Sequence, residues 1–464
     1  MRIGHILIIS YSAYPAPTKQ SKMLGNIIKA LGPRFDADVL TIRESDMGYI
    51  EKIKRNRLLR VPVGGTAEEQ IESFQRAVSR QLDSDEYDII HFRSPWAGGI
   101  IAQKLKYLES KILYEPSLGV TGNDNLHLRD KFEEFEHISL EISDMVVVSS
   151  QHQSDIIRSN YGISKPVKII PPGVDVDRFD WDIVTGLRQM DIVWVDNFTD
   201  PDIITWVVDE LSSLCKIMPD FIMGMVGNVD HNIAQDVVKI IEQKGLSENI
   251  KFFGPQEEDA IPLLISRGKL GFVSPSAATS RIVPRFDCIN ILEYMACKTP
   301  VIAPANPFVM EITRNGTLAS LYNPQTSGSL RDTILSSLEK TEEMEKVSDE
   351  AYSMVRKYFT ASEMRRRLVD SYAEILPPAA VEVTDEAFSK ESQRPGTISW
   401  QGKKTSSTGA GSRVPTSLTS DHSPNDNEIP LEVDDIEFEA SGVLLGVDYT
   451  DDSSETDPFQ PARP

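Results

Sequence analysis

The sequence predicts an α/β protein with two lobes, each built on a mainly parallel sheet, followed by a disordered acidic tail. Short apolar strands alternate with amphipathic helices through residues 1–376, which is typical of a parallel sheet covered by helices. The alternation restarts after residues 177–189, and the periodic apolar pattern ends beyond residue 376. A chain of 464 residues is also too long for one compact core, which indicates two or three folded units.

The first lobe is predicted to span residues 1–178. Its short apolar runs indicate strands at His5–Ser10, Ala37–Thr41, Ile89–His91, Lys111–Tyr114, Met145–Val148 and Val167–Ile170. Apolar residues at helical spacing between these strands predict helices at Ser21–Leu31, Ala67–Leu82, Ala97–Tyr107, Asp130–Ile142 and Gln151–Tyr161.

The second lobe is predicted to span residues 179–361. Its expected strands are Asp191–Val195, Phe221–Val226, Ile250–Phe253, Leu270–Ser274 and Pro300–Ala303. Its expected helices are Ile203–Ile217, Ile233–Lys244, Ile291–Ala296 and Ser329–Glu339. A last helix, residues 362–376, is predicted to cross back to the first lobe. Ligands of open α/β sheets bind beyond the carboxyl ends of the strands, so a cleft between the lobes is the expected site.

Composition excludes several classes of protein. The net charge of −22 argues against a nucleic-acid partner. No apolar run approaches the roughly 20 residues that a membrane-spanning helix needs. The first ten residues have the pattern of a buried strand, not of a signal peptide. Three cysteines are too few for a disulfide framework and lack metal-ligand spacing, so a cytoplasmic location is expected.

The tail, residues 377–464, begins at two prolines that end the last helix. Its first part, to about residue 427, is rich in Ser, Thr, Gly and Pro and is predicted to be a disordered linker. From Asp421 to Pro464 the chain has 13 acidic residues and one basic residue. The apolar-bearing stretch Ile429–Tyr449 is interpreted either as solvated tail or as a peptide that binds a basic groove of a protein partner.

Four blocks of sequence, in order along the chain, resemble the GT-B glycosyltransferases, and within them the retaining glycosyltransferase family 4. The blocks are Tyr87–Trp96, Glu141–Ser149, Ile169–Asp175 and Ile291–Ala303. The resemblance implies two Rossmann-like lobes. It also implies transfer of a sugar from a nucleotide-diphosphate donor to a carbohydrate or lipid-linked acceptor, with retention at the anomeric carbon and without a metal or other cofactor.

The last block is the most specific one. A helix that starts at the cleft offers free amide groups to a phosphate, and Glu293, one turn into it, can accept hydrogen bonds from two ribose hydroxyls. The resemblance implies this role for Glu293. The alternative is that Glu293 only charges the helix start. Asn290, Ile291 and Leu292 of the same helix are included in the expected donor site.

The donor site departs from the family pattern where it should hold the pyrophosphate. The arginine and lysine that the resemblance implies are replaced by Asn197 and Asp202. Arg281 and Arg285 are the predicted substitutes, as a pair of guanidinium groups on one loop. Gly227 and Ser274, at the ends of two predicted strands, complete the expected site.

These departures leave two functions open. One is a working glycosyltransferase. The alternative is a catalytically weak or inactive relative that acts as a binding or scaffold protein through its cleft and acidic tail. Asp200-Pro201-Asp202 is interpreted as a helix cap and not as a metal motif.

In the first lobe, the resemblance implies a site residue in the turn after Tyr114, where many relatives have a histidine near the sugar and others have an acid, so Glu115 and Arg93 are the catalytic candidates. The alternative is a buried ion pair. The glycine turn that many relatives have after the first strand is missing; Lys19 and Lys22 are candidates to supply charge there, and the alternative is that they are ordinary surface lysines.

The segment Ile50–Val63 carries five basic residues and a single acid, Glu51. It is interpreted either as a patch that holds the enzyme against an anionic membrane, on its inner face, or as a charged loop before a strand at Arg60–Val63.

Overall fold

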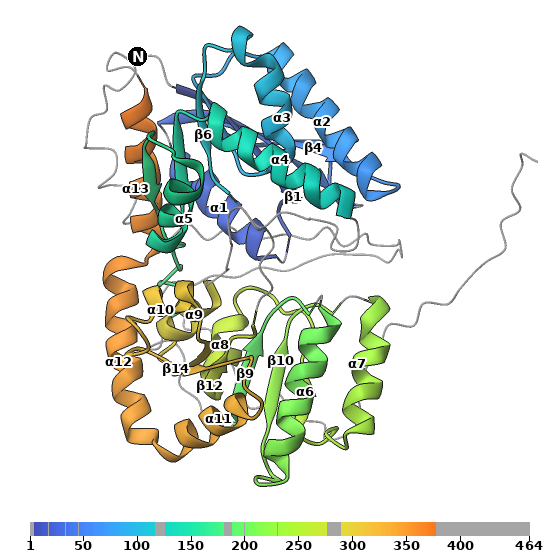
Figure 1. Ribbon diagram of the computed structural model, residues 1–464, viewed down its shortest axis with the longest axis vertical. Helices are drawn as coiled ribbons and strands as arrows, with labels where there is room; N and C mark the ends of the chain where they lie inside the picture. Colours follow the sequence, from blue (N-terminus) through green and yellow to red (C-terminus); the bar gives the residue numbers. More distant parts are fainter. Residues whose placement is uncertain are drawn as a thin grey trace, which may run out of the picture. The chain divides into compact units, whose positions relative to one another are not determined.

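We describe the protein from a computed structural model (Figure 1). The structure describes residues 4–16, 18–32, 34–44, 46–116, 126–180, 188–198, 200–229, 231–275 and 289–376. By its contacts the chain divides into a unit of residues 1–382 and a unit of residues 383–464. The predicted linker and acidic tail lie outside the described residues.

Two sheets organise the first unit, one in each predicted lobe. The first has the order β3-β4-β2-β1-β5-β6-β7-β8 and the second the order β11-β10-β9-β12-β13-β14. The strands of the first are β1 Gly4–Ala13, β2 Phe35–Arg43, β3 Ile50–Ile53, β4 Asn56–Pro62, β5 Ile89–Phe92, β6 Lys111–Tyr114, β7 Met145–Val148 and β8 Val167–Ile169. Those of the second are β9 Met190–Val195, β10 Met223–Val226, β11 Ile250–Phe252, β12 Gly268–Phe272, β13 Val301–Pro304 and β14 Ser320–Tyr322. Every described pairing is parallel except that of β3 with β4, so the predicted α/β fold with two parallel sheets is confirmed.

Helices connect most of the strands. Those of the first lobe are α1 Lys19–Leu31, α2 Ala67–Ser84, α3 Pro95–Lys104, α4 Leu126–Ile142 and α5 Gln151–Tyr161. Those of the second are α6 Pro201–Cys215, α7 His231–Gln243, α8 Ile261–Ser266, α9 Ile289–Ala296, α10 Pro307–Ile312, α11 Ser329–Glu339 and α12 Thr341–Tyr358, before the last helix α13 Ala361–Ile375. The predicted helix Ala97–Tyr107 is shorter than expected, because its end, Leu105–Tyr107, is a 3-10 turn.

The central strands explain why the sequence pattern identified the sheets. Every residue of β7 and β9 is buried; β7 is a continuous apolar run, and β9 is apolar except for Asp191 near its start. Strands that are covered by helices on both faces need such runs, because neither face meets water. The prediction of these strands needed no knowledge of their partners.

The expectation of a charged loop before a strand at Arg60–Val63 was wrong. Residues 50–62 form an antiparallel hairpin, β3 and β4, at the edge of the first sheet. All four residues of β3 are exposed, so its side chains show no buried face from which a strand could be predicted. Strand β4 pairs in parallel with β2 through seven residues, which fixes the hairpin in the sheet.

The last two helices pack against different lobes, although they are adjacent in the sequence (Figure 1). Met354 and Val355 of α12 belong to the same buried cluster as α9 of the second lobe. Leu368 and Tyr372 of α13 belong to a buried cluster of the first lobe, and α13 contacts α1. The chain therefore returns to the first lobe at its described end.

The junction between the lobes is fixed by the backbone around Gly173. Val174 N donates to Phe359 O at 2.8 Å, and Ala361 N donates to Val174 O at 2.7 Å. A Cβ on Gly173 would lie 2.6 Å from Thr360 O. Only glycine allows this approach, which gives a physical reason for the glycine in the Ile169–Asp175 block.

Candidate functional site

Glu293 is the fifth of the eight residues of α9, and its carboxylate has one occupied and one open oxygen. The residue is 2% exposed. Its Oε1 accepts a hydrogen bond from Lys22 Nζ of α1 at 2.9 Å. Its Oε2 is buried and has no hydrogen-bond partner in the part of the chain that the structure describes. A buried acceptor without a partner is costly, so this oxygen is suited to a ligand donor.

The residues around Glu293 anchor the helix. Asn290 Nδ2 donates to Val195 O at 2.5 Å, at the end of β9. The Tyr294 hydroxyl accepts from Val195 N at 2.8 Å and donates to Phe272 O at 3.1 Å, at the end of β12. The start of α9 is therefore tied to the carboxyl ends of two neighbouring strands, where the sheet rule places a ligand.

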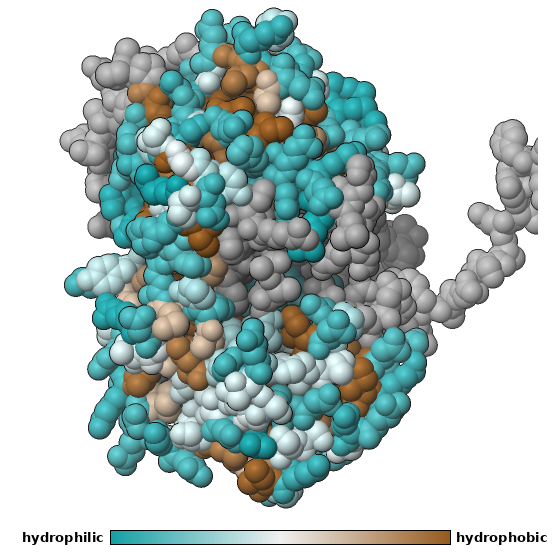
Figure 2. Space-filling view, in the orientation of Figure 1, coloured by the Kyte–Doolittle hydropathy of each residue, from teal (hydrophilic) through white to brown (hydrophobic). Residues whose placement is uncertain are grey.

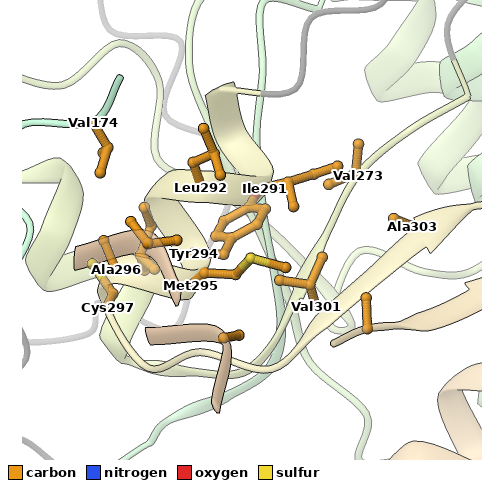
Figure 3. Packing of buried hydrophobic residues seen from close by; sticks show 14 of the residues in the cluster. Val174, Val273, Ile291, Leu292, Tyr294, Met295, Ala296, Cys297, Val301 and Ala303 are labelled. Atoms are coloured by element: carbon orange, nitrogen blue, oxygen red, sulfur yellow. The ribbon is translucent and has the colours of Figure 1, made fainter. Parts of the chain in front are cut away.

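Ile291 and Leu292 do not offer their side chains to a ligand. Both are fully buried and pack in the apolar cluster around Tyr294 and Met295 (Figure 3). If these two residues contact a donor, they do so through their backbone atoms.

A second carboxylate of the site, Asp196, was not among the predicted site residues. It follows β9 directly, and Lys19 Nζ lies 3.1 Å from its Oδ1. Ser274 Oγ donates to its Oδ2 at 2.9 Å, and Asn197 N donates to its Oδ1 at 2.8 Å. An acid directly after a buried strand is the signal that could have identified it.

The predicted residues Asn197, Ser274 and Gly227 therefore meet around Asp196. Gly227 has a φ of +144°, and a Cβ at this position would lie 1.8 Å from Asp196 O. The strand ends can only come this close because residue 227 is a glycine. Asn197 is linked to Lys19 through Asp196, since both contact the Oδ1 atom of that carboxylate. In the described part of the chain, no contact of the Asn197 side chain joins it to Glu293.

Asp202 lies in the first turn of α6, apart from this group. Its backbone N–H and that of Ile203 donate to Asp200 Oδ1, at 3.0 and 3.3 Å. The interpretation of Asp200-Pro201-Asp202 as a helix cap is confirmed. Arg281 and Arg285 lie outside the described residues.

The first-lobe candidates Arg93 and Glu115 belong to a buried polar network. Arg93 Nη2 lies 3.2 Å from Glu115 Oε1, and His91 Nε2 lies 3.0 Å from Glu115 Oε2. The other ring nitrogen of His91, Nδ1, lies 2.7 Å from the Tyr372 hydroxyl of α13. These side chains are all less than 10% exposed. The structure thus contains the buried ion pair that was the alternative interpretation of Arg93 and Glu115.

The charge of Glu115 is held by its neighbours. Burial raises the pKa of the Glu115 carboxyl, but Arg93 and His91 outweigh burial and lower this pKa to about 2. Glu115 is thus an ionised carboxylate with both oxygens occupied. His91 and Tyr372 were not predicted. His91 lies within the apolar strand β5, and no sequence pattern links it to Tyr372, which is 281 residues away.

Sequence models of two glycosyltransferase families match the chain, one in each lobe. The model described as Glycosyltransferase Family 4 matches residues 20–178, and the model described as Glycosyl transferases group 1 matches residues 204–354. The chain belongs to the GT-B glycosyltransferases. No curated protein sequence matches this glycosyltransferase significantly.

Solved structures show the same fold at low sequence identity. Sucrose-phosphate synthase from Thermosynechococcus elongatus matches with a TM-score of 0.68 and 19% identity, over 82% of this chain and 100% of that one. HepE from Anabaena, in complex with UDP-glucose, matches with a TM-score of 0.62 and 17% identity, over 80% and 100% of the two chains. WaaG, a glycosyltransferase involved in lipopolysaccharide biosynthesis, matches with a TM-score of 0.61 and 13% identity, over 80% and 99%.

The basic segment of this glycosyltransferase has fewer free cations than its sequence suggests. Arg55 is paired with Asp36, and Arg57 with Asp38 and Asp85. The Arg60 side chain is 1% exposed and donates to Glu51 and to two backbone carbonyls. Lys52 and Lys54 remain on the exposed edge, so contact with an anionic membrane stays a prediction that rests on fewer charges.

The described residues offer no candidate for a metal site or for a membrane-spanning helix. They contain no group of three or more His, Cys, Asp or Glu side chains placed to hold a metal ion. None of their helices is both long and apolar enough to cross a membrane. On the face shown in Figure 2, polar residues cover most of the described surface and apolar residues occur in scattered groups.

Proposed function

We propose that this glycosyltransferase transfers a sugar from a nucleotide-diphosphate donor to a carbohydrate or lipid-linked acceptor, with retention at the anomeric carbon. The observation that carries the proposal is the open oxygen of Glu293. A buried carboxylate, with one oxygen held by Lys22 and the other unpartnered among the described residues, is poised to accept hydrogen bonds from a polyhydroxyl ligand.

A ribose fits this carboxylate for a chemical reason. Its two vicinal hydroxyls are donors on adjacent carbons, and a carboxylate accepts such a pair without changing its own protonation state. Hydrogen bonds to a charged group are worth about 1.5–3 kcal/mol each. The helix that carries this carboxylate, α9, is hydrogen-bonded through Tyr294 to the ends of β9 and β12, where α/β proteins bind nucleotides.

The relatives support this choice of donor. The HepE structure holds UDP-glucose, and the match to family 4 supports retention through the resemblance to a retaining family. Uridine nucleotides are therefore the first probes, with guanosine and adenosine nucleotides beside them.

We assign Arg93 and Glu115 a positioning role in this reaction. Glu115 is ionised and both of its oxygens are occupied, so it is a poor general acid. The pair and His91 instead join the ends of β5 and β6 to each other. The residues that orient the donor and stabilise the departing diphosphate then decide the rate.

The test of this function is nucleotide binding followed by turnover. Glu293→Ala should weaken binding of UDP, GDP or ADP, whichever the wild type binds, by roughly 1–3 kcal/mol in titration calorimetry. Unchanged affinity would remove Glu293 from the site.

Turnover separates the enzyme from an inactive relative. Donor hydrolysis and transfer should be measured for the wild type and for Asn197→Arg with Asp202→Lys, over a panel of nucleotide sugars. We expect activity in the wild type and a faster double variant, because cations near the leaving diphosphate stabilise its developing charge. Absence of turnover in both proteins with every donor would favour a binding or scaffold role instead.

A further inference from the structure

The segment that joins β9 to α6 is unfavourable for a diphosphate by its charge. Residues 196–202 contain three aspartates, at positions 196, 200 and 202, and no lysine or arginine. Glu293 adds another carboxylate one turn into α9. Lys298, at the far end of α9, is paired with Asp349 of α12 at 3.0 Å. A donor whose ribose reaches Glu293 would therefore meet negative charge on these segments.

In the described structure, two lysines of the first lobe contact the carboxylates of Asp196 and Glu293 in the second lobe. Lys19 and Lys22 lie in the first turn of α1, three positions apart, and such residues share one face of a helix. Lys19 Nζ lies 3.1 Å from Asp196, and Lys22 Nζ lies 2.9 Å from Glu293. Each ammonium thus bridges from the first lobe to one of the two second-lobe segments that form the site.

We propose that Lys19 and Lys22 form the diphosphate-binding subsite of this enzyme, in place of the two cations that are missing at Asn197 and Asp202. The inference rests on the proposed function, since it assumes a nucleotide whose ribose binds Glu293. The ligand class is a nucleoside diphosphate, free or as a nucleotide sugar.

The chemistry of an ammonium group allows this double use. Each lysine ammonium has three N–H donors, so a contact with a carboxylate does not by itself prevent it from also donating to a phosphate oxygen. Asp196 and Glu293 hold the two side chains in an extended position between the lobes. Both lysine side chains are 20–24% exposed, so their remaining donors are accessible to a ligand. The positive dipole end at the start of α1 favours an anion at the same place.

The open oxygen of Glu293 sets the position of the phosphates. A ribose hydrogen-bonded to Oε2 carries its 5′ carbon on the opposite side of one small ring. A diphosphate on that carbon lies within reach of side chains as long as those of Lys22 and, one helical turn earlier, Lys19. The carboxylate that binds the sugar and the lysine that binds the phosphate are thus neighbours through one hydrogen bond.

The arrangement also links phosphate binding to the contact between lobes. In the family pattern both cations belong to the second lobe, whereas here they belong to the first. The diphosphate should therefore bind only when both lobes are together, while a nucleoside needs Glu293 and the second lobe.

The experiment compares uridine, UMP and UDP, or the matching series for guanosine or adenosine, by titration calorimetry. The variants are Lys19→Met, Lys22→Met and the double variant. The matched control is Lys29→Met, which removes an exposed lysine from the last turn of the same helix. Melting temperatures show whether each variant is folded. A Lys22→Arg variant keeps the positive charge and therefore tests whether that charge is what matters.

We expect Lys19→Met to weaken UDP binding by about tenfold or more, the scale of one charge-assisted hydrogen bond, and to change uridine binding by less than about twofold. The double variant should lose most of the affinity difference between UDP and uridine, and most of the salt dependence of UDP binding. Lys29→Met should behave as the wild type.

Two failures are distinguishable. Equal losses for UDP and uridine, or wild-type UDP affinity in the double variant, would overturn the lysine subsite while Glu293→Ala still tests the nucleoside site. A wild type that binds no nucleoside and no nucleotide would overturn the proposed function and this inference together.

Discussion

Two buried carboxylates, Glu115 in the first lobe and Glu293 in the second, differ in how their oxygens are used. Both oxygens of Glu115 are occupied, by Arg93 and His91 of neighbouring first-lobe strands. Glu293 has one oxygen held by a lysine of the other lobe and one oxygen that has no partner among the described residues.

The difference separates a structural site from a binding site. Folding selects partners for buried charges, because an unpaired one is costly. A carboxylate whose partners all come from its own lobe contributes to that lobe's stability. A buried carboxylate that lacks a partner is better explained by a ligand that supplies the missing donors. By this criterion the first-lobe network supports the fold, and the second-lobe carboxylate serves recognition.

The largest effect is expected at Glu115. Glu115→Ala leaves the Arg93 guanidinium without its carboxylate in a site where Arg93 is 1% exposed. Breaking a buried ion pair in this way costs about 3–5 kcal/mol of unfolding free energy. Chemical denaturation of the wild type, Glu115→Ala and Glu293→Ala measures it. If Glu293→Ala destabilises the protein as much as Glu115→Ala, the comparison between the two carboxylates fails.

The pH dependence of stability sharpens the same contrast. The Glu115 pKa lies at about 2 in the folded protein, below its ordinary value of 4.5. A lowered pKa contributes stability that is present above pH 4.5 and is lost as the pH falls towards 2. The difference in unfolding free energy between wild type and Glu115→Gln should therefore be constant from pH 7 to about 5 and shrink below it. A difference that is as large at pH 3 as at pH 7 would show that the ionised carboxylate is not its source.

The sequence predicted what local patterns determine. The strand Lys111–Tyr114 and the helix Gln151–Tyr161 have the predicted bounds, because each is a simple apolar or amphipathic run between clear breaks. The hairpin β3–β4 was missed because its first strand has no buried face. Helix α12 was also not predicted, since its buried residues are few and separated by charged ones.

The site was predictable only in part. Glu293 was found through the resemblance of its block to a family. Its partner Lys22 lies 271 residues away, so no spacing rule could have joined the two. The same holds for His91 and Tyr372, which meet because α13 returns to the first lobe. Contacts between distant segments are set by the tertiary fold, which local periodicity does not encode.

An intermediate effect is expected at Tyr372. Tyr372→Phe removes the hydroxyl that is hydrogen-bonded to His91 Nδ1 and leaves the buried ring nitrogen without that partner. The expected loss is roughly 1–3 kcal/mol of unfolding free energy, with nucleoside affinity unchanged. Chemical denaturation and calorimetry on the same protein decide this. A loss of nucleoside affinity without loss of stability would place the first-lobe network in the binding site instead.

The smallest change in stability is expected for Glu293→Gln, which keeps the shape of the side chain. The substitution removes a buried negative charge that lacks one partner, and leaves Lys22, whose side chain is 24% exposed and can be hydrated. We expect the unfolding free energy to change by less than about 1 kcal/mol, the range of a partly exposed ion pair. Nucleoside affinity should fall in the same protein, because an amide offers only one acceptor oxygen to the two ribose hydroxyls. Glu115→Gln is the matched comparison, and it should show the reverse, a loss of stability with nucleoside affinity retained. If Glu293→Gln loses stability and keeps its affinity, Glu293 is a structural residue like Glu115.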